Sequence, residues 1–555
     1  MPGAAGSYYS GPVAVNDPAA GAPPAPEEPV QPEPQRARRL ALSTAFFSAA
    51  TGLSRVAGLV REIVAASYFG VTGAMSAFTI AFQVPNLMRA LFADAALQGA
   101  FVPVFTELLE KGRKKEAFAV ASALFSLITM VLGSVTILFW LLAPEIMPLF
   151  SPGFGPHLQH LTVQLSRVMF PIVLLLALSG LVVGMLNSFE HFSVPALAPV
   201  IWNVLIIASL VGLTPAFHGD DRIYAYAIGV LVGTIVQFLL PLPWLRNRGG
   251  RFSLNFNWRN PHVTRVLKLM LPVTIALGLI NFDALINSIF GTLVNVQAPS
   301  AIDKAFRIYM LPQGLFSVAI ATILFPTLSR FAARKAFDDL RNTMSNGIRQ
   351  ILMLLIPSAA IMGVLAVPIT RLVYQRGAFG GGATNLVSDA MWVWALSLPA
   401  NGTSLLFSRT FFSLQKPWLN TSLAMGNLAL NVVFSAALYK PLGVEGVVLG
   451  SVISTTAMAL AQAAYLRRDL GGIEGGKIAA ALARILIAAA VLAGVSYGIW
   501  YPLDQALGRS LIAQIVSLGT GITVGVAVYV GAVLAMKLEE ARQISRLLRG
   551  RLSRS

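Results

Sequence analysis

The stretch that decides the fold is Phe118–Ala143, FAVASALFSLITMVLGSVTILFWLLA, which runs for 26 residues without a charged side chain. A helix that spans a membrane needs about 20 consecutive apolar residues. A second uncharged stretch, Val168–Leu186, is 19 residues long, and similar runs repeat along the chain. These runs are continuous, and in lipid the backbone must pair within a helix or a closed barrel. The sequence therefore predicts an all-α integral membrane protein.

The composition of the whole chain leads to the same class. Its 555 residues are 56% hydrophobic and 12% charged, whereas soluble domains have about 25% charged residues. The net charge of +17 is what a membrane protein gains from basic cytoplasmic loops beside anionic head groups. We therefore expect membrane lipids as partners and no nucleic acid. The chain has no cysteine, which excludes disulfides and thiolate chemistry.

The spacing of apolar runs predicts about fourteen transmembrane helices. The loops between them are too short for a second soluble domain. Residues 1–38, rich in Pro, Ala and Gly, are predicted to form a disordered cytoplasmic tail, and 537–555 a basic cytoplasmic tail. The predicted helices span 40–69, 75–108, 117–143, 160–187, 194–214, 223–245, 264–296, 301–330, 343–375, 384–412, 417–439, 443–467, 478–502 and 510–536.

Basic residues concentrate in every second loop of this arrangement. Lys-rich and Arg-rich loops stay in the cytoplasm, according to the positive-inside rule. An even number of helices then places both termini in the cytoplasm and makes the chain a multi-pass membrane protein. The basic clusters are Arg36–Arg39, Lys111–Lys115, Arg246–Arg251, Arg330–Lys335, Arg467–Arg468 and Lys537–Arg554.

The two halves of the chain also contain a weak internal repeat. Four pairs of landmarks lie 227, 224, 228 and 224 residues apart. A repeat of six helices gives two copies of the same orientation, as in transporters whose halves rock around a central site. We predict two six-helix lobes in parallel pseudo-repeat, 39–245 and 246–468, and two extra C-terminal helices within 469–536. The pairs are Pro85 with Pro312, Pro144 with Pro368, Pro171 with Pro399, and Asn203 with Asn427.

Several charged side chains fall inside the predicted helices, where each costs at least about 2.5–3.5 kcal/mol on insertion scales. The planar guanidinium of arginine offers paired donors to phosphate and stays charged. Arginines converging from helices 1, 2 and 8 would form an anion-binding cavity, although Arg61 and Glu62 could instead be a structural ion pair. The charged residues are Arg55, Arg61, Glu62, Arg89, Asp94, Asp283 and Arg307.

A second polar group suggests a coupling ion. Asp283 and Asn287 are one turn apart, and so are Asn427 and Asn431. Oxygen ligands at this spacing could hold Na⁺, while the alternative is hydrogen bonding between helices. No phosphate-binding P-loop occurs in the sequence. We therefore expect a transporter and not an enzyme, with no cofactor other than a coupling ion.

Several motifs together resemble one known family. They are Ser54-Arg55-Val56-Ala57-Gly58-Leu59-Val60-Arg61-Glu62, Phe69-Gly70, Pro85-Asn86-Leu87-Met88-Arg89, Ala100-Phe101-Val102-Pro103-Val104-Phe105 and Arg376-Gly377-Ala378-Phe379. With these motifs the sequence resembles the MurJ (MviN) lipid II flippases, of the multidrug/oligosaccharidyl-lipid/polysaccharide exporter superfamily. The resemblance covers about residues 40–536.

The resemblance implies a bacterial plasma-membrane protein that moves lipid II outward by alternating access for peptidoglycan synthesis. Cell-wall synthesis or division proteins are then candidate partners. The family's cavity arginines match Arg55, Arg61, Arg89 and Arg307, its acidic partner matches Glu62, and a cavity serine matches Ser300. Asn86, within the second-helix motif, joins this candidate site. The family's sodium-site positions match Asn287, Asn427 and Asn431, where members can have aspartate at the first and last; Asp283 is a further candidate.

Other functions would leave different signs in the sequence. A flippase for another undecaprenyl-linked glycan would bind the same diphosphate, so the arginines do not separate it from a lipid II flippase. A cation-coupled drug exporter would favour an acidic cavity. A membrane glycosyltransferase or polymerase would need acidic residues in sizeable external loops, and the external loops here are short. A scaffold without transport would tolerate reversal of the buried charges.

Overall fold

The computed structural model describes residues 34–92, 95–246, 253, 255–538 and 540. Within helices, the side chains of 34–45, 48, 89–92, 95–99 and 271–281 are not described. The tails predicted at 1–38 and 537–555 lie mostly outside the described residues. Asp94 and the side chain of Arg89, two of the charged residues within the predicted helices, also lie outside the described set.

Every regular element in the described residues is helical. The first half contains α1 (Pro34–Phe69), α2 (Gly73–Phe92), α3 (Ala95–Glu110), α4 (Lys114–Phe150), α5 (Pro156–Met169), α6 (Ile172–Ser188), α7 (Ser193–Leu213) and α8 (Tyr224–Leu239). The second half contains α9 (Pro261–Val294), α10 (Ala298–Pro312), α11 (Val318–Ala333), α12 (Phe337–Val364), α13 (Ala366–Tyr374), α14 (Gly381–Ser413), α15 (Pro417–Asp469), α16 (Gly475–Leu507) and α17 (Leu511–Ala535).

Several predicted helices differ from the observed ones in their ends and breaks. The helix α1 begins at Pro34, inside the range predicted to be a tail. The predicted helix 160–187 is divided into α5 and α6 next to Pro171, because proline lacks an N–H donor and crowds the preceding turn. The range of α15 contains two helices that meet at a kink at Gly443, where φ is 58°, so the predicted division between 417–439 and 443–467 is present in the structure.

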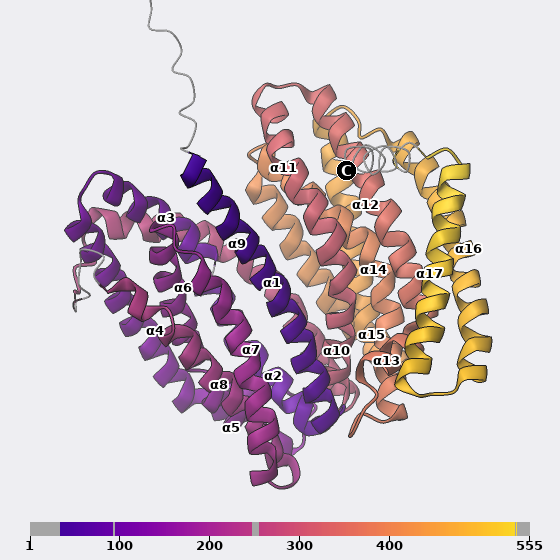
Figure 1. The fold of residues 1–555 in the computed structure, drawn as a ribbon, viewed down its shortest axis with the longest axis horizontal. Coiled ribbons are helices and arrows are strands. Elements are labelled where there is room, and N and C mark those ends of the chain that lie inside the picture. The colour runs from indigo at the N-terminus through magenta and orange to yellow at the C-terminus, as the bar shows by residue number, and fades with distance from the viewer. Residues whose placement is uncertain (1–33, 93–94, 247–252, 254, 539, 541–555) are drawn as a thin grey trace, which may run out of the picture.

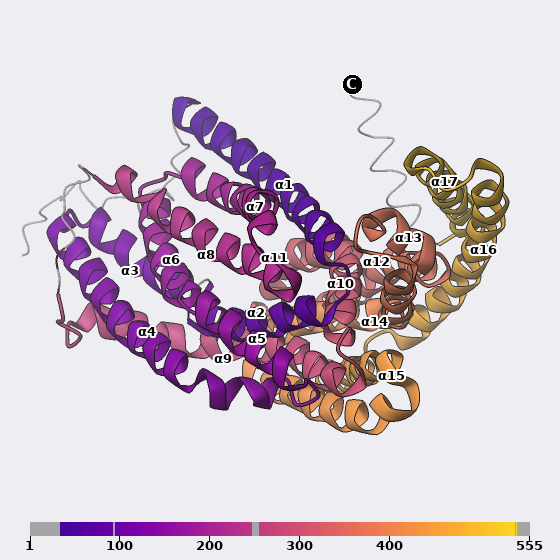
Figure 2. The ribbon, with the colours of Figure 1, turned by 90° about the horizontal axis from the view of Figure 1, so that it is seen from below.

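The helices form two groups that are visible in Figure 1 as the indigo-to-magenta half and the rose-to-orange half. The long helix α9 contacts α2 and α3 of the first group and α10 and α15 of the second, so it connects them. The helices α16 and α17 pack on each other, and α16 packs on α12. In Figures 1 and 2 this pair stands at the outer edge of the second group.

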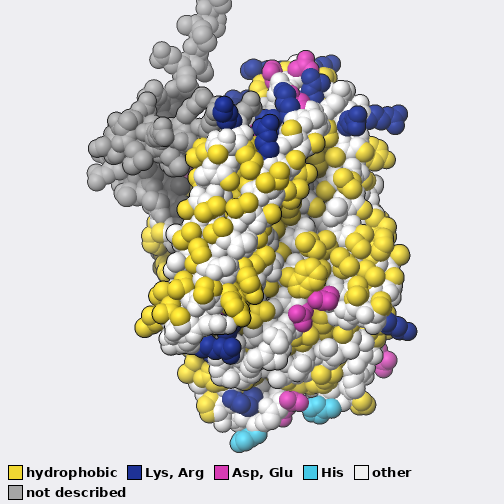
Figure 3. All heavy atoms as spheres, turned by 90° about the vertical axis from the view of Figure 1, so that its right-hand side faces the viewer, with side chains coloured by type: hydrophobic (Ala, Val, Ile, Leu, Met, Phe, Trp, Pro, Cys, Tyr) yellow, Lys and Arg dark blue, Asp and Glu magenta, His cyan; other side chains and the backbone are white. Residues whose placement is uncertain are grey.

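The face of the molecule drawn in Figure 3 is apolar over a broad band between its two ends. Large side chains such as Ile512 and Ile323 are 75% and 73% exposed, which is unfavourable in water and suits contact with lipid. Most of the Lys and Arg side chains visible in Figure 3 gather at its upper end. Among the described residues, nine helical stretches are long and apolar enough to cross a membrane. The prediction of an all-helical, multi-pass membrane protein is confirmed.

Candidate functional site

A cluster of charged side chains lies between α1 and α10, with the buried Glu62 at its centre and the partly exposed Arg307 at its edge. One oxygen of Glu62, Oε1, accepts from Arg61 Nη2 at 2.5 Å and lies 3.1 Å from Arg307 Nη1. The side chain of Glu62 is only 5% exposed. Arg307 also donates from Nε to Asp303 Oδ2 at 2.7 Å. The two arginines, far apart in the sequence, are thus held together by a shared carboxylate.

One member of this cluster, Lys304, was not among the predicted site residues. Its side chain is completely buried, its ammonium lies 5.4 Å from the centre of the Tyr374 ring, and it makes no hydrogen bond with any described residue. Lysine inside a predicted membrane helix was a signal that could have identified it. Among Arg61, Glu62, Asp303, Lys304 and Arg307, three cations face two carboxylates, so this cluster has a net charge of +1.

Arg61 also lines a cavity of about 420 Å³ inside the first helix group. Its guanidinium lies 4.9 Å from the centre of the Trp202 ring, and its Nε is buried without a hydrogen-bond partner in the described part of the chain. Asn86 of α2 lines the same cavity, together with Thr234 and Gln237 of α8. The structure thus brings two predicted site residues, Arg61 and Asn86, to one partly polar cavity.

The remaining predicted cargo-site residues lie in three different settings. Arg55 is exposed on α1, and no break of this helix at Gly58 turns it towards the buried Arg61. Arg89 lies on α2, but its side chain is outside the described set. Ser300 is buried at the contact between α10 and α2, where its amide donates to Ser76 Oγ at 3.2 Å.

The candidate cation residues come together in a hydrogen-bonded network between α9 and α15. Asn431 Nδ2 donates to Asp283 Oδ1 at 2.6 Å and lies 3.4 Å from Asn287 Oδ1. Two hydroxyls complete the network, because Ser451 donates to Asn287 and Ser435 donates to Asn431. Among the described residues, Asp283 is the only carboxylate of this network. A cation would favour the position next to this carboxylate, and the amide nitrogen of Asn431 occupies that position.

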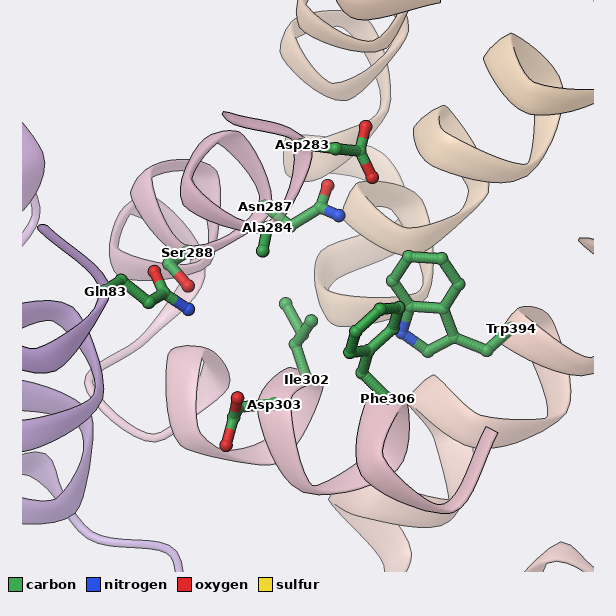
Figure 4. A pocket seen from close by; sticks show the side chains of 9 residues that line it. All are labelled: Gln83, Asp283, Ala284, Asn287, Ser288, Ile302, Asp303, Phe306 and Trp394. Atoms are coloured by element: carbon green, nitrogen blue, oxygen red, sulfur yellow. The ribbon is translucent and has the colours of Figure 1, made fainter. Parts of the chain in front are cut away.

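A small pocket opens beside this network (Figure 4). Its volume is about 30 Å³, which is room for about one water molecule. In Figure 4, Asp283 and Asn287 lie on one side of this space, and the rings of Phe306 and Trp394 lie on another. Asn427, the fourth predicted ligand, does not line the pocket, and its Oδ1 is buried without a partner among the described residues.

Comparisons with known proteins place this geometry in a family. The sequence model of the family "Lipid II flippase MurJ" matches residues 65–516. A probable lipid II flippase MurJ of Rhizobium meliloti is 31% identical over 422 residues, covering 75% of this chain and 78% of that protein. The lipid II flippase MurJ of Burkholderia cenocepacia is 30% identical over 407 residues, covering 72% and 78%.

Solved structures of transporters have the same fold. A lipid II flippase MurJ in an inward closed conformation has a TM-score of 0.73 at 23% identity, covering 89% of this chain and 99% of that one. An inward-facing multidrug transporter of the MATE family has a TM-score of 0.61 at 16% identity, covering 78% and 95%. These likenesses concern the fold, whereas the sequence matches identify the family. The chain belongs to the MurJ lipid II flippases, a family of membrane transporters and not of enzymes.

Proposed function

We propose that this protein moves lipid II, the undecaprenyl-diphosphate-linked peptidoglycan precursor, from the inner to the outer leaflet of a bacterial plasma membrane. The observation that carries the proposal is the cluster in which Glu62 holds Arg61 and Arg307 together across the two helix groups. The side chain of Arg61 is 11% exposed and that of Arg307 is 34% exposed, and charged residues within membrane-spanning helices are costly and commonly mark the path of a charged substrate. The diphosphate makes lipid II such a substrate.

In this mechanism, Glu62 occupies the arginines while cargo is absent. A diphosphate offers more charge and more acceptor oxygens than one carboxylate, so it displaces Glu62 and draws Arg61 and Arg307 to itself. Lys304, which has no hydrogen-bond partner among the described residues, supplies a further positive charge nearby. Arg55 of α1 and Arg89 of α2 add positive charge along the path of the cargo, and Asn86 and Ser300 bind polar parts of the cargo.

The architecture behind this mechanism is two lobes that alternate in exposing the site. We assign residues 39–245 and 246–468 to two six-helix lobes in parallel pseudo-repeat, and 469–536 to two added helices. In the described part of the chain, nine stretches are strongly apolar, and one of them, α15, counts as two crossings. Four further crossings are α1, α2 together with α3, α9, and α14, which brings the total to fourteen. Charged residues lower the hydropathy of α1, and the bend at Gly443 divides α15.

The orientation follows from the basic loops. With Lys- and Arg-rich loops in the cytoplasm, both termini are cytoplasmic, and the contact between α1 and α10 lies nearer the outer side. Cell-wall synthesis or division proteins, which consume or organise lipid II at the membrane, are the expected partners. The network of Asp283, Asn287 and Asn431 is a candidate Na⁺ site, since all three offer oxygen atoms.

The test is complementation in a bacterium depleted of its own lipid II flippase. The unaltered chain, Arg61→Gln, Arg307→Gln and the control Arg330→Gln would be compared, with the membrane level of each checked. Arg330 is exposed at the end of α11, so its loss removes the same charge away from the cluster around Glu62. Lipid II in the outer leaflet would be measured directly.

We expect the unaltered chain and Arg330→Gln to restore outward lipid II, and Arg61→Gln and Arg307→Gln to fail at normal membrane levels. If the well-expressed unaltered chain leaves lipid II inside, the cargo assignment is wrong, and other undecaprenyl-linked glycans become the candidates. If Arg61→Gln and Arg307→Gln both transport normally, the cluster is a structural ion pair and not the cargo site.

A further inference from the structure

A cavity with a basic lining, which shares no residue with the cluster around Glu62, lies where α12, α16 and the segment after α17 meet. Its volume is about 260 Å³. The charged residues that line it are Arg349, Lys477, Arg484, Lys537 and Glu540. Four cations thus face one carboxylate, which gives the lining a net charge of +3. Small apolar side chains, Ala480 and Ala481, form part of the wall.

The base of this cavity is a fixed part of the structure. Arg349 Nε pairs with Glu540 Oε1 at 2.6 Å, and the two side chains are only 11% and 3% exposed. Leu538, between α17 and Glu540, is also buried. Lys537 has a left-handed backbone with φ of 57°, which is uncommon for a residue with a side chain. The chain after α17 is therefore anchored against α12, and it holds Lys537 at the rim.

Two of the cations have no counter-charge in the described structure. Lys477 pairs with Glu474 at 2.5 Å, and Arg349 pairs with Glu540. Arg484 and Lys537 are exposed at the rim and form no ion pair with any described residue. A cavity with a fixed ion pair below and two unpaired cations above is suited to a phosphate group, which brings negative charge and several acceptors.

The surface next to these cations is apolar and faces outward. Leu486 and Ile487 follow Arg484 on α16 and are 51% and 59% exposed, and Val530 and Leu534 precede Lys537 on α17 and are 46% and 39% exposed. Figure 3 views this side of the molecule, with most basic side chains at its upper end and a largely apolar surface below. A ligand that fits both features has a phosphate head and hydrocarbon chains.

We propose that this cavity binds the phosphate head group of an anionic phospholipid from the leaflet on the side of the basic loops. Basic pockets between membrane helices at the cytoplasmic surface recognise such head groups. Bound there, the lipid would bridge α16 and the end of α17 through Arg484 and Lys537. It would thereby strengthen the attachment of this edge pair of helices to α12.

The test is the thermal stability and lipid retention of the purified full chain in neutral detergent. Phosphatidylglycerol, phosphatidylcholine and inorganic phosphate would be added separately. The variant Arg484→Gln/Lys537→Gln removes the two unpaired cations. The control Arg467→Gln/Arg468→Gln removes two exposed charges from the last turn of α15, outside the cavity. The conservative variant Arg484→Lys/Lys537→Arg keeps the charge and checks that the positions tolerate substitution.

We expect phosphatidylglycerol, but neither phosphatidylcholine nor inorganic phosphate, to raise the melting temperature of the unaltered chain. Each basic side chain near an anionic surface raises the affinity roughly fivefold. The double neutral variant should therefore bind phosphatidylglycerol about 30-fold more weakly. The control and conservative variants should behave like the unaltered chain. If inorganic phosphate stabilises the protein as much as phosphatidylglycerol does, the ligand of this cavity is a soluble phosphate compound and not a lipid. If all variants bind phosphatidylglycerol equally, this cavity is not the site that binds it.

Discussion

The amide nitrogen of Ala378 donates a hydrogen bond to the carbonyl oxygen of Ser67 at 2.8 Å, which joins the end of α1 to the loop after α13. Two glycines with left-handed backbones allow this approach, Gly70 with φ of 58° and Gly377 with φ of 57°. A Cβ atom on Gly377 would lie 2.3 Å from the Ser67 oxygen. The two helix groups are therefore in direct backbone contact at the end of the molecule opposite the start of α1 (Figure 1).

We predict that Gly377→Ala opens this contact. A left-handed backbone costs a residue with a side chain about 1–2 kcal/mol, and the new methyl group would collide with Ser67. Because the chain has no cysteine, a single cysteine at Ser67 can report the opening by its rate of reaction with a maleimide. We expect this rate to rise roughly tenfold, in line with that free-energy cost.

The matched control for this substitution is Gly380→Ala. Gly380 lies three residues further on, its φ is −83°, and a Cβ atom there would meet nothing within 4 Å. Labelling of the cysteine at position 67 should stay at its original rate in this control. Equal rates in Gly377→Ala and the unaltered chain would show that the contact does not depend on glycine.

We predict that Glu62→Gln lowers the stability of the protein strongly. The carboxylate serves Arg61 and Arg307 at once, and it is almost completely buried. Removing one partner from a buried ion pair typically costs about 3–5 kcal/mol, because a charge is left without compensation. Thermal unfolding in detergent, without lipid II, would measure the effect as a lower melting temperature.

Two further variants test the cause. Asp338→Asn breaks the pair with Arg341 on α12, but Asp338 is 85% exposed, so the expected change is about 0–1 kcal/mol. The double variant Glu62→Gln/Arg307→Gln should be more stable than Glu62→Gln alone, because it removes one of the uncompensated cations. A double variant that is less stable than both single variants would contradict the shared-carboxylate explanation.

Much of the fold follows from local patterns in the sequence, but the breaks in the helices do not. Each predicted helix coincides with helical residues, because an uncharged run of this length is stable in lipid only as a helix. Prolines did not mark the breaks reliably. Pro171 and Pro312 lie at helix ends, whereas Pro85 and Pro103 lie within α2 and α3. Packing from neighbouring helices can stabilise a helix across a proline.

The candidate site was predictable in its residue types but not in its pairings. Arginines inside apolar helices are conspicuous, and the sequence pointed to Arg61 and Arg307 for that reason. The contact of Arg307 with Glu62 depends on how α10 packs against α1, and no local pattern contains that information. The separation of Arg55 from Arg61 and Arg307 follows instead from the unbroken course of α1.

We predict that Lys304→Met keeps or raises stability and weakens cargo binding. The ammonium of Lys304 is fully buried without a hydrogen bond to a described residue, so replacing it with an apolar chain of similar length removes a desolvation cost. Lipid II should bind about tenfold or more weakly if the lost charge contacts its diphosphate. The melting temperature and lipid II affinity would be measured on the same samples.

The control for Lys304→Met is Lys416→Met, which removes one positive charge at another position. Lys416 pairs with Asp469, and its side chain is 46% exposed at the start of α15. We expect little change in lipid II affinity there. If Lys304→Met unfolds readily and the folded fraction binds lipid II normally, Lys304 is a structural residue and contributes nothing to the cargo site.

The last prediction concerns sodium. In the unaltered chain, the amide of Asn431 donates to Asp283 at 2.6 Å and so fills the position of a cation. Asn431→Asp would replace this donor with a second carboxylate facing the first. We therefore expect a lower melting temperature in choline chloride, because the two negative charges repel each other, and a recovery in sodium chloride. A bound ion at 100 times its dissociation constant stabilises by about 2.7 kcal/mol.

The control for Asn431→Asp is Asn420→Asp on the same helix. Asn420 Oδ1 accepts from Ser408 and Gln462, so a carboxylate there keeps both hydrogen bonds and should respond equally to sodium and choline. The unaltered chain should show a smaller sodium effect than Asn431→Asp, since its amide competes with the ion. Sodium could instead raise the melting temperature of the unaltered chain as much as that of Asn431→Asp. In that case the side-chain amides of the network must turn their oxygen atoms towards the bound ion. Sodium coupling would then need only one carboxylate.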